Sequence, residues 1–458
     1  MLETPENAIL ETFESQKVYF ATHQTKSVSF RIQQLKKLRK SIKVNQTKIE
    51  EALWKDLHKS PEEAYLTEIS IVLNEIDYHI LNLKQWAKPK RVHTPLHLRP
   101  SSSKIIYEPL GVALLITPWN YPFQLLINSL IGAISGGCCS ILKPSPDAPT
   151  IAKLIEEMIA SIFAPEYACV LQGGKDTNTI LLQQKFDVIF FTGSSRVGKI
   201  IMKAAAEHLT PFILELGGKS PCIVGKEANL DVAARRITWS KLINSGQTCI
   251  APDYLFVHSS IKNQLLTKIT KEIENMYGKN PQESRFYPRI VNNKAHQRLQ
   301  GLLKQGTIHT GGNFDEEDLY IAPTIIDDVK ENFEIMKEEI FGPILPVMTY
   351  ENIIEAIDFI NKNEKPLAFY YFGKNARAKE VLSKTSSGGG CINDALLHIA
   401  NHHLPFGGVG NSGLGKYHGN RSFLAFTNER SIVSTPTWID LRFRFVPFKF
   451  YKWVKRIV

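Results

Sequence analysis

Residues 110–142 have the sequence LGVALLITPWNYPFQLLINSLIGAISGGCCSIL, and no charged side chain interrupts this run. An uncharged stretch of this length is long enough to cross a membrane. Its interior argues against a membrane span, because two prolines and several side-chain amides would leave a broken helix and polar groups in lipid. The run instead predicts a buried strand at 111–117, a helix opened by Pro122, and a second buried strand at 138–142.

Short apolar runs and amphipathic helices alternate along most of the chain, and this alternation predicts parallel sheets covered by helices on both faces. In a first region we expect helices at 148–163 and 197–209 and strands at 169–172, 188–192 and 212–216. In a second region, 231–390, we expect strands at 254–258 and 322–326 and helices at 261–277 and 353–361. The predicted fold class is α/β, with two open sheets.

The ends of the chain depart from this alternation. Residues 13–87 are predicted to be mostly helical, and 102–107 is a candidate strand in a protruding arm. The helical segment has an apolar stripe that we interpret as core packing and not as a binding face. The stripe consists of Leu66, Ile69, Leu73, Ile76, Ile80 and Leu83.

The composition is that of a globular protein, and its length predicts two to four domains or one large composite unit. Of 458 residues, 43% are hydrophobic and 22% charged, which excludes a disordered or fibrous chain. Six cysteines are too few for a disulfide scaffold, and the adjacent Cys138 and Cys139 indicate a reducing compartment. Residues 1–14 carry four Glu and no basic residue, so they are no secretory signal. We therefore expect a cytoplasmic protein.

The formal net charge is +10, and half of it lies in residues 434–458, where six basic side chains face one acidic side chain. The rest of the chain is only mildly basic, which excludes a nucleic-acid partner. In the tail, Leu441, Phe443 and Phe445 alternate with arginines, and apolar residues at helical spacing follow Pro447. This pattern is typical of a peripheral membrane helix. An arm packed across a partner subunit, or over the substrate entrance, explains it equally well.

The stretch Gly193-Ser-Ser-Arg-Val-Gly198-Lys199 follows a predicted strand and opens a predicted helix. It lacks the Ser or Thr of a P-loop, because Ile200 follows the lysine, and it lacks the spacing of a dinucleotide fingerprint. A turn of this kind binds an anion at the helix N-terminus, or it is a tight turn that binds nothing. The stretch 408–413 has the fingerprint spacing, but no apolar strand leads into it.

Two residues are candidates for the reacting groups. Cys249 follows the flexible Gly246, and a thiolate is a natural nucleophile toward aldehydes and acyl groups. Most cysteines are inert core residues, so the alternative is a structural thiol. Glu215 ends an apolar strand and precedes two glycines, where desolvation would raise its pKa and favour a general base. A solvated strand end is the alternative there.

Other polar residues are candidates for supporting roles. Asn120 is able to donate its amide to a developing oxyanion, or it is an ordinary turn residue. Lys143 ends an apolar strand and would be costly to bury without an anion. Glu339 and Phe341 combine a carboxylate with an aromatic face. The adjacent His402 and His403 lack other ligands at zinc spacing, so we expect no metal site.

These segments together resemble motifs of the aldehyde dehydrogenase superfamily, in the same order and over nearly the whole chain. The matching segments are Ile116-Thr-Pro-Trp-Asn120, Phe191-Thr-Gly-Ser194, Glu215-Leu-Gly-Gly218, Gly246-Gln-Thr-Cys249, Glu339-Ile-Phe-Gly-Pro343 and Pro405-Phe-Gly-Gly408. The short N-terminus and the stretch 405–419 resemble the class 3 branch, which includes fatty and aromatic aldehyde dehydrogenases and typically forms homodimers.

The resemblance implies a mechanism and its residues. Cys249 attacks the aldehyde, Asn120 and the Cys249 backbone N–H hold the oxyanion, hydride passes to NAD or NADP, and Glu215 activates the water that hydrolyses the thioester. The implied cofactor contacts are Ile116, Thr117, Pro118, Trp119, Lys143, Gly193, Ser194, Gly198, Leu216, Glu339 and Phe341. We expect Tyr121, Trp239 and Phe406 to line a funnel for apolar aliphatic or aromatic aldehydes.

The resemblance also implies a division of the chain into an aldehyde dehydrogenase-like pair of Rossmann-type domains and a small β oligomerisation arm. We expect an NAD(P)-binding domain from 1–85 and 108–213, a catalytic domain at 214–399, an arm from 86–107 and 400–435, and a tail at 436–458.

Three other functions compete with aldehyde oxidation to the acid. A dehydrogenase that passes the acyl group to coenzyme A is disfavoured by Glu215, because such chemistry excludes water. A P-loop nucleotide hydrolase is disfavoured by Ile200. A catalytically silent relative is disfavoured because Cys249, Glu215 and Asn120 are all present.

The cofactor preference gives a prediction. The family commonly has Lys-Pro-Ser-Glu where this chain has Lys143-Pro-Ser-Pro146. A carboxylate at that place would bind the adenosine ribose hydroxyls and repel a 2′-phosphate, whereas Pro146 leaves Lys143 free to pair with phosphate. We expect kcat/KM measurements to show that NADP is accepted, and Pro146→Glu to shift preference toward NAD. Negligible efficiency with NADP beside that with NAD would contradict this expectation.

Overall fold

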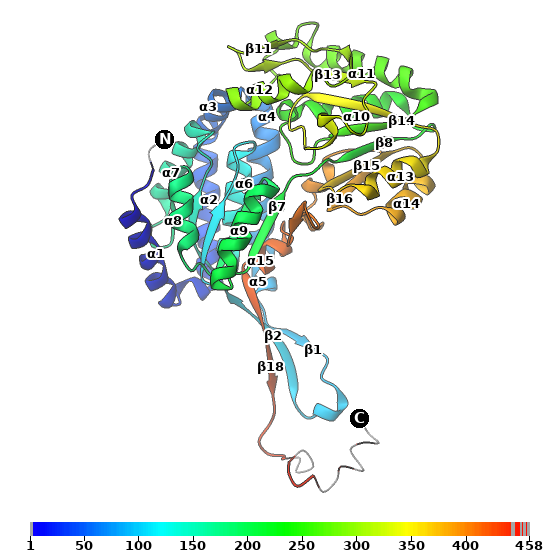
Figure 1. The fold of residues 1–458 in the computed structure, drawn as a ribbon. Coiled ribbons are helices and arrows are strands. Elements are labelled where there is room, and N and C mark those ends of the chain that lie inside the picture. Colours follow the sequence, from blue (N-terminus) through cyan, green and yellow to red (C-terminus); the bar gives the residue numbers. More distant parts are fainter. Residues whose placement is uncertain (1–2, 441–444, 449–450, 452–454, 456–458) are drawn as a thin grey trace.

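The computed structural model describes residues 3–440, 445–448, 451 and 455. The chain forms two α/β lobes side by side, and a narrow arm projects from them (Figure 1). In the described residues, no helix is long and apolar enough to cross a membrane. The α/β class expected from the sequence is confirmed.

The first lobe contains a six-stranded sheet in the order β17-β7-β6-β3-β4-β5, parallel except for β17. The uncharged run 110–142 forms β3, the helix after it and most of β4. That helix, α6, begins at Pro122 and is buried along its whole length, because other helices cover it on the sheet. The strands are β3 (Val112–Ile116), β4 (Cys139–Lys143), β5 (Ala168–Val170), β6 (Val188–Gly193), β7 (Phe212–Leu216) and β17 (Gly413–Leu414).

The helices of this lobe come mainly from the N-terminal third of the chain. They are α1 (Glu6–Ala21), α2 (Val28–Val44), α3 (Gln46–Leu57), α4 (Pro61–Ala64), α5 (Ser70–Trp86), α6 (Pro122–Gly136), α7 (Pro149–Ile162), α8 (Lys175–Gln183), α9 (Ser195–His208) and α15 (Asn420–Ala425). A single π-helical turn, η2 (Tyr65–Ile69), joins α4 to α5.

The second lobe contains a seven-stranded sheet in the order β10-β13-β14-β9-β8-β15-β16, in which only β10 is antiparallel. Its strands are β8 (Pro221–Val224), β9 (Tyr254–His258), β10 (Thr307–Thr310), β13 (Thr324–Asp327), β14 (Ile344–Tyr350), β15 (Ala368–Phe372) and β16 (Gly389–Ile392); β11 (Phe314–Asp315) and β12 (Tyr320–Ile321) form a separate hairpin. Its helices are α10 (Leu230–Leu242), α11 (Lys262–Tyr277), α12 (Asn293–Leu302), α13 (Ile353–Lys362) and α14 (Asn375–Lys384).

The arm is a three-stranded antiparallel sheet, β1 (Lys90–Val92), β2 (Ser102–Pro109) and β18 (Thr427–Ser434). It extends away from both lobes (Figure 1). The candidate strand at 102–107 lies within β2 and is confirmed. For the tail we expect an alternating apolar segment and then a helix. Most of both lies outside the described residues, because the structure does not describe 441–444, 449–450, 452–454 and 456–458.

The N-terminal apolar stripe follows its prediction with one exception. Ile69, Ile76 and Leu83 are fully buried in the core. Leu66, by contrast, is 67% exposed and lines a cavity, so its assignment to the core is wrong. The reason is the π-helical turn η2, which widens the helix here and shifts its residues from regular helical spacing.

Candidate active site

Cys249 follows a turn with an unusual backbone. After α10 the chain enters the short helix η4 (Ile243–Gly246), where Asn244, Ser245 and Gly246 have φ angles of 53°, 50° and 73°. Such left-handed conformations cost on the order of 1–3 kcal/mol each for non-glycine residues. At Gly246 a Cβ would lie 2.2 Å from the Gly342 carbonyl oxygen, so only glycine fits.

Hydrogen bonds on both sides hold this turn in place. The Gln247 side-chain amide donates to the Asn244 and Arg289 carbonyl oxygens, both at 3.0 Å, and its oxygen accepts from the Val291 N–H at 3.0 Å. Beyond the turn, the Tyr370 hydroxyl donates to the Ile250 carbonyl oxygen at 2.6 Å. The segment that carries Cys249 is therefore fixed before any ligand binds.

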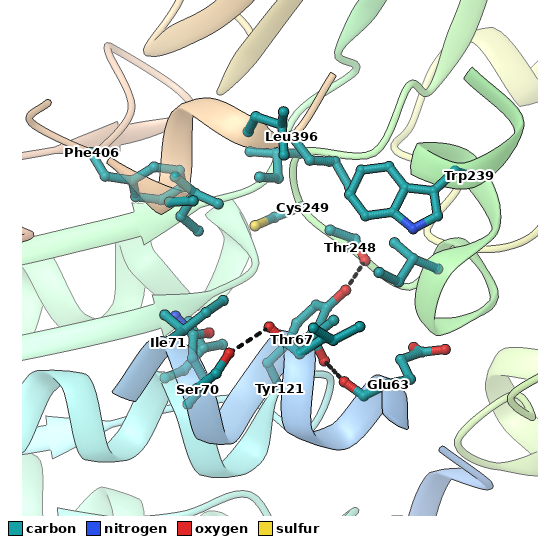
Figure 2. Close-up of a pocket in the computed structure, with 18 of the residues that line it drawn as sticks. Glu63, Thr67, Ser70, Ile71, Tyr121, Trp239, Thr248, Cys249, Leu396 and Phe406 are labelled. Carbon is teal, nitrogen blue, oxygen red and sulfur yellow. Dashed lines mark hydrogen bonds between the residues drawn. The ribbon is translucent and has the colours of Figure 1, made fainter. Parts of the chain in front are cut away.

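The Cys249 thiol lines a cavity of about 580 Å³ and points into it (Figure 2). Burial raises the pKa of this thiol, and the negative charges of Glu339 and Glu215 raise it further. The thiol is thus protonated near neutral pH when these carboxylates are ionised. A nucleophilic role requires a base or a positive charge close by.

Glu215 lines the same cavity, near the end of β7. Its carboxylate is buried, and neither oxygen has a hydrogen-bond partner among the described residues. Burial raises the pKa of Glu215 well above its usual range, and the ammonium of Lys416 opposes that rise. A buried, unpartnered carboxyl beside a thiol has the environment of a general base.

Asn120 lies in the loop between β3 and α6, and its side chain is also buried. Its amide donates to the Gln247 carbonyl oxygen at 3.0 Å, two residues before Cys249. A carboxamide carries two N–H donors, so this bond leaves one donor. The structure therefore brings Cys249, Glu215 and the loop of Asn120 together, although they are far apart in the sequence.

The cavity at Cys249 is mostly apolar and includes all three residues expected in the substrate funnel. Tyr121, Trp239 and Phe406 all line it, as Figure 2 shows. The Tyr121 hydroxyl shares a 2.7 Å hydrogen bond with Thr248 Oγ1, which places the tyrosine ring on the cavity wall. The other apolar lining side chains include Leu66, Ile71, Leu125, Ile243, Met276, Phe286, Leu396, Leu397 and Ile399.

A second cavity, of about 940 Å³, lies at the N-terminus of α9, and its lining is more polar than that of the first cavity. Trp119, Ser194 and Glu339 line it, together with Gly217 and its neighbours. A Cβ at Gly217 would lie 2.0 Å from a Glu339 carboxylate oxygen, so the glycine allows this close approach. Burial raises the pKa of Glu339 to about 8. Helix N–H groups and a carboxylate suit the pyrophosphate and a ribose of a dinucleotide.

The remaining predicted cofactor residues do not line this second cavity. Leu216 lines the first cavity instead and packs on Gly198, where a Cβ would lie 2.9 Å from it. Phe341 has a φ of 52° and contacts the Trp119 ring edge to face at 5.5 Å. Lys143 is buried, and its ammonium donates to the Pro144 carbonyl oxygen at 2.9 Å. Ile116, Thr117, Pro118 and Gly193 lie at or next to the ends of β3 and β6.

Burial leaves Lys143 costly to charge. Its removal from water lowers the pKa of Lys143 to about 8, and the negative charge of Glu3 opposes that change. The sequence predicts that Lys143 needs an anionic partner. Among the described residues, Glu3 acts on it electrostatically without forming an ion pair.

Sequence reasoning missed several residues of the first cavity. Tyr417 and His418 line it, and Lys416 acts on Glu215 electrostatically. These three residues belong to the Gly-rich stretch 405–419, which resembles the class 3 branch. No sequence pattern indicated a chemical role for any one of them. Leu396 and the helix η8 (Leu397–Ala400) had no distinguishing signal.

The chain matches known proteins over its whole length. A profile of the aldehyde dehydrogenase family matches residues 4–432. A 4,4'-diaponeurosporen-aldehyde dehydrogenase of Staphylococcus aureus (strain NCTC 8325 / PS 47) is 48% identical, covering 98% of this chain and 99% of that protein. A dimeric NADP-preferring aldehyde dehydrogenase of Canis lupus familiaris is 43% identical over 96% of this chain and 98% of its own.

A solved structure agrees with these matches. The substrate-bound state of Staphylococcus aureus AldH superimposes with a TM-score of 0.96 at 46% identity, covering 98% of this chain and 99% of that chain. This chain belongs to the aldehyde dehydrogenase family. The predicted resemblance to class 3 enzymes, the NAD(P)-dependent oxidation of aldehydes to acids and the aldehyde dehydrogenase fold are thereby confirmed.

The environment of Glu215 gives a prediction for its pH dependence. A base acts only when deprotonated, and the raised pKa of Glu215 means that its carboxylate accumulates only at higher pH. We expect kcat to rise with pH through this ionisation. Glu215→Gln should lower kcat by about 10²–10⁴-fold and remove that rise. Steady-state rates across pH measure both effects. The control is Glu14→Gln, at an exposed residue on α1. If Glu215→Gln keeps the wild-type pH profile, Glu215 is not the base.

Proposed function

We propose that this enzyme oxidises apolar aliphatic or aromatic aldehydes, with Cys249 as the nucleophile and Glu215 as the base. The observation that carries this proposal is the apolar cavity of about 580 Å³ that is lined by both reacting groups. In the proposed first step, Cys249 gives up its proton and its sulfur attacks the aldehyde carbon. Since burial raises the pKa of the thiol, the carboxylate form of Glu215 takes this proton, and Glu215 releases it to solvent before the hydrolysis step.

The oxygen of the aldehyde gains negative charge in this step. The Asn120 amide and the Cys249 backbone N–H donate hydrogen bonds to it. A fixed donor of this kind contributes about 10²–10³-fold in kcat, because it acts where charge develops. Support comes from the bond between the Asn120 amide and the Gln247 carbonyl oxygen, which holds the amide next to the Cys249 turn.

The residues around the second cavity fit a dinucleotide. Ser194 and the first turn of α9 would hold its pyrophosphate, and Glu339 would bind a ribose hydroxyl. When bound, NAD(P)+ supplies the hydride acceptor of the reaction. The acyl group then left on Cys249 is hydrolysed by a water from which Glu215 takes a proton. NADP use is supported by Pro146 and by the name of the relative from Canis lupus familiaris.

Membership of the aldehyde dehydrogenase family argues against a P-loop nucleotide hydrolase. At the position where that class has a Ser or Thr that binds magnesium, this chain has Ile200, which is 52% exposed. Transfer of the acyl group to coenzyme A is disfavoured by Glu215, whose carboxylate has no hydrogen-bond partner among the described residues and is free to bind a water.

The cavity lining gives a prediction for substrate length. Each buried CH₂ group contributes about 0.8 kcal/mol, or about a fourfold gain in kcat/KM, until the cavity is filled. We expect the efficiency to rise from acetaldehyde toward long-chain aldehydes such as hexadecanal, and benzaldehyde to be a substrate. The measurement is a steady-state panel that follows reduced cofactor, with and without coenzyme A. Trp239→Ala should reduce the increase in kcat/KM with chain length. Its control is Trp54→Ala, because Trp54 is an exposed tryptophan on α3. Equal efficiency at all lengths would reject the apolar funnel.

We propose further that two chains form a homodimer through the arm. Support comes from the word "dimeric" in the name of the relative from Canis lupus familiaris, and from the exposed apolar side chains of Leu96 and Val433 on the arm. A cytoplasmic location is supported by the six cysteines, all of which are unpaired.

Membrane contact through the tail remains one of two proposals for that segment. The described part exposes Trp438, Val446, Phe448 and Tyr451, which favours burial against some apolar surface. If that surface is a membrane, a chain truncated after Thr437 should lose flotation with anionic liposomes, because its cationic and aromatic residues are gone. The full-length chain on neutral liposomes is the control. Equal flotation of both chains would leave the partner subunit or the substrate entrance as the contact.

A further inference from the structure

Lys59 and Glu68 form a fully buried ion pair that the mechanism above does not use. The Lys59 ammonium lies 2.5 Å from a Glu68 carboxylate oxygen, and both side chains have no exposed surface. Lys59 lies between α3 and α4, and Glu68 lies in the π-helical turn η2. Taking two charges out of water is costly, so a buried ion pair needs further hydrogen bonds. Both Lys59 and Glu68 make such bonds to the backbone near Asn120.

Lys59 binds the loop that carries Asn120. Its ammonium donates to the Asn120 carbonyl oxygen at 2.9 Å and lies 4.0 Å from the centre of the Tyr121 ring. A cation near an aromatic ring is attracted to its face, and the attraction is stronger when water is excluded. Lys59 thus holds two consecutive residues, one of which carries the amide proposed to bind the oxyanion.

Glu68 binds the other end of the same loop. Its second carboxylate oxygen accepts from the Phe123 N–H at 2.9 Å and from the Gln124 N–H at 3.1 Å. These donors belong to the first turn of α6, where the N-cap residue Tyr121 makes no side-chain cap of its own. A carboxylate at a helix N-terminus satisfies free N–H groups and the positive end of the helix dipole. The loop is therefore bound on both sides by one ion pair.

The same segment reaches the turn of the nucleophile. The Asn244 amide donates to the Asn120 carbonyl oxygen at 2.8 Å, so this oxygen accepts from both Lys59 and the catalytic turn. The Glu63 carboxylate accepts from the Asn244 backbone N–H at 2.8 Å, at a residue with a positive φ. The Asn120 loop and the Cys249 turn are thereby tied to the same short stretch, 59–68.

We propose that Lys59 and Glu68 are positioning residues that fix the Asn120 amide at the oxyanion. Neither side chain lines the substrate cavity, so they act through the loop and not by contact with the aldehyde. The inference rests on the role proposed above for Asn120. Because the oxyanion forms only in the transition state, displacement of the amide lowers kcat and leaves KM nearly unchanged.

The test uses the full-length enzyme with the cofactor present. The double variant Lys59→Met/Glu68→Gln removes both charges, so neither is left buried alone, and the glutamine oxygen still accepts from α6. We expect kcat per folded enzyme to fall about 10–10²-fold, the scale of a small misplacement of a catalytic group, while KM stays within about twofold. Thermal unfolding gives the folded fraction. The matched control is Arg39→Gln/Asp77→Asn, an ion pair between α2 and α5 outside both cavities.

Asn120→Ala separates positioning from a general structural effect. In this background we expect the double variant to lower kcat no further, because the amide that it displaces is already gone. An equal loss in both backgrounds, or wild-type kcat in the double variant, would overturn the positioning role. If Asn120→Ala alone leaves kcat intact, the oxyanion role of Asn120 fails, and this inference fails with it.

Discussion

Burial of ionisable groups in the space between the two lobes is the constraint on which the site depends. Burial raises the pKa of Cys249, Glu215 and Glu339 together, and each carboxylate raises the pKa of the thiol further. Ionisation of any one of these groups is therefore costly while its neighbours are ionised. Transfer of a proton from the thiol to the Glu215 carboxylate then moves a buried charge and creates no new one.

The fold provides this space at the passage from one sheet to the other. Glu215 lies near the end of β7, and only residues 217–220 separate β7 from β8 of the second sheet. Gly217 lies in that passage, and its lack of a side chain allows the Glu339 carboxylate to approach. The carboxyl ends of parallel strands are where open α/β sheets usually bind their ligands, because the strand order leaves a crevice there.

Groups that stabilise a developing charge must also be held rigidly, because their effect depends on their position. The turn before Cys249 has three consecutive left-handed residues, and side-chain hydrogen bonds of Gln247 hold it. The Asn120 loop has a separate support in the Lys59–Glu68 pair. The second support comes from residues 59–68, which are remote in sequence, so the position of the Asn120 loop depends on the docking of the N-terminal helices against the rest of the protein.

Sequence alone determined the α/β class and the exact bounds of some strands, such as β7 and β9. It also identified the candidates Cys249, Glu215 and Asn120. Both results depend on periodicity and motifs, which are properties of neighbouring residues. It did not reveal β8, β14, β15 or β16, or the exposure of Leu66, which depends on a π-helical turn. Nor did it mark Lys59 and Glu68. Charged residues in a helical segment look like a solvated face, and only the tertiary structure shows what covers them, because burial arises from contacts between distant segments.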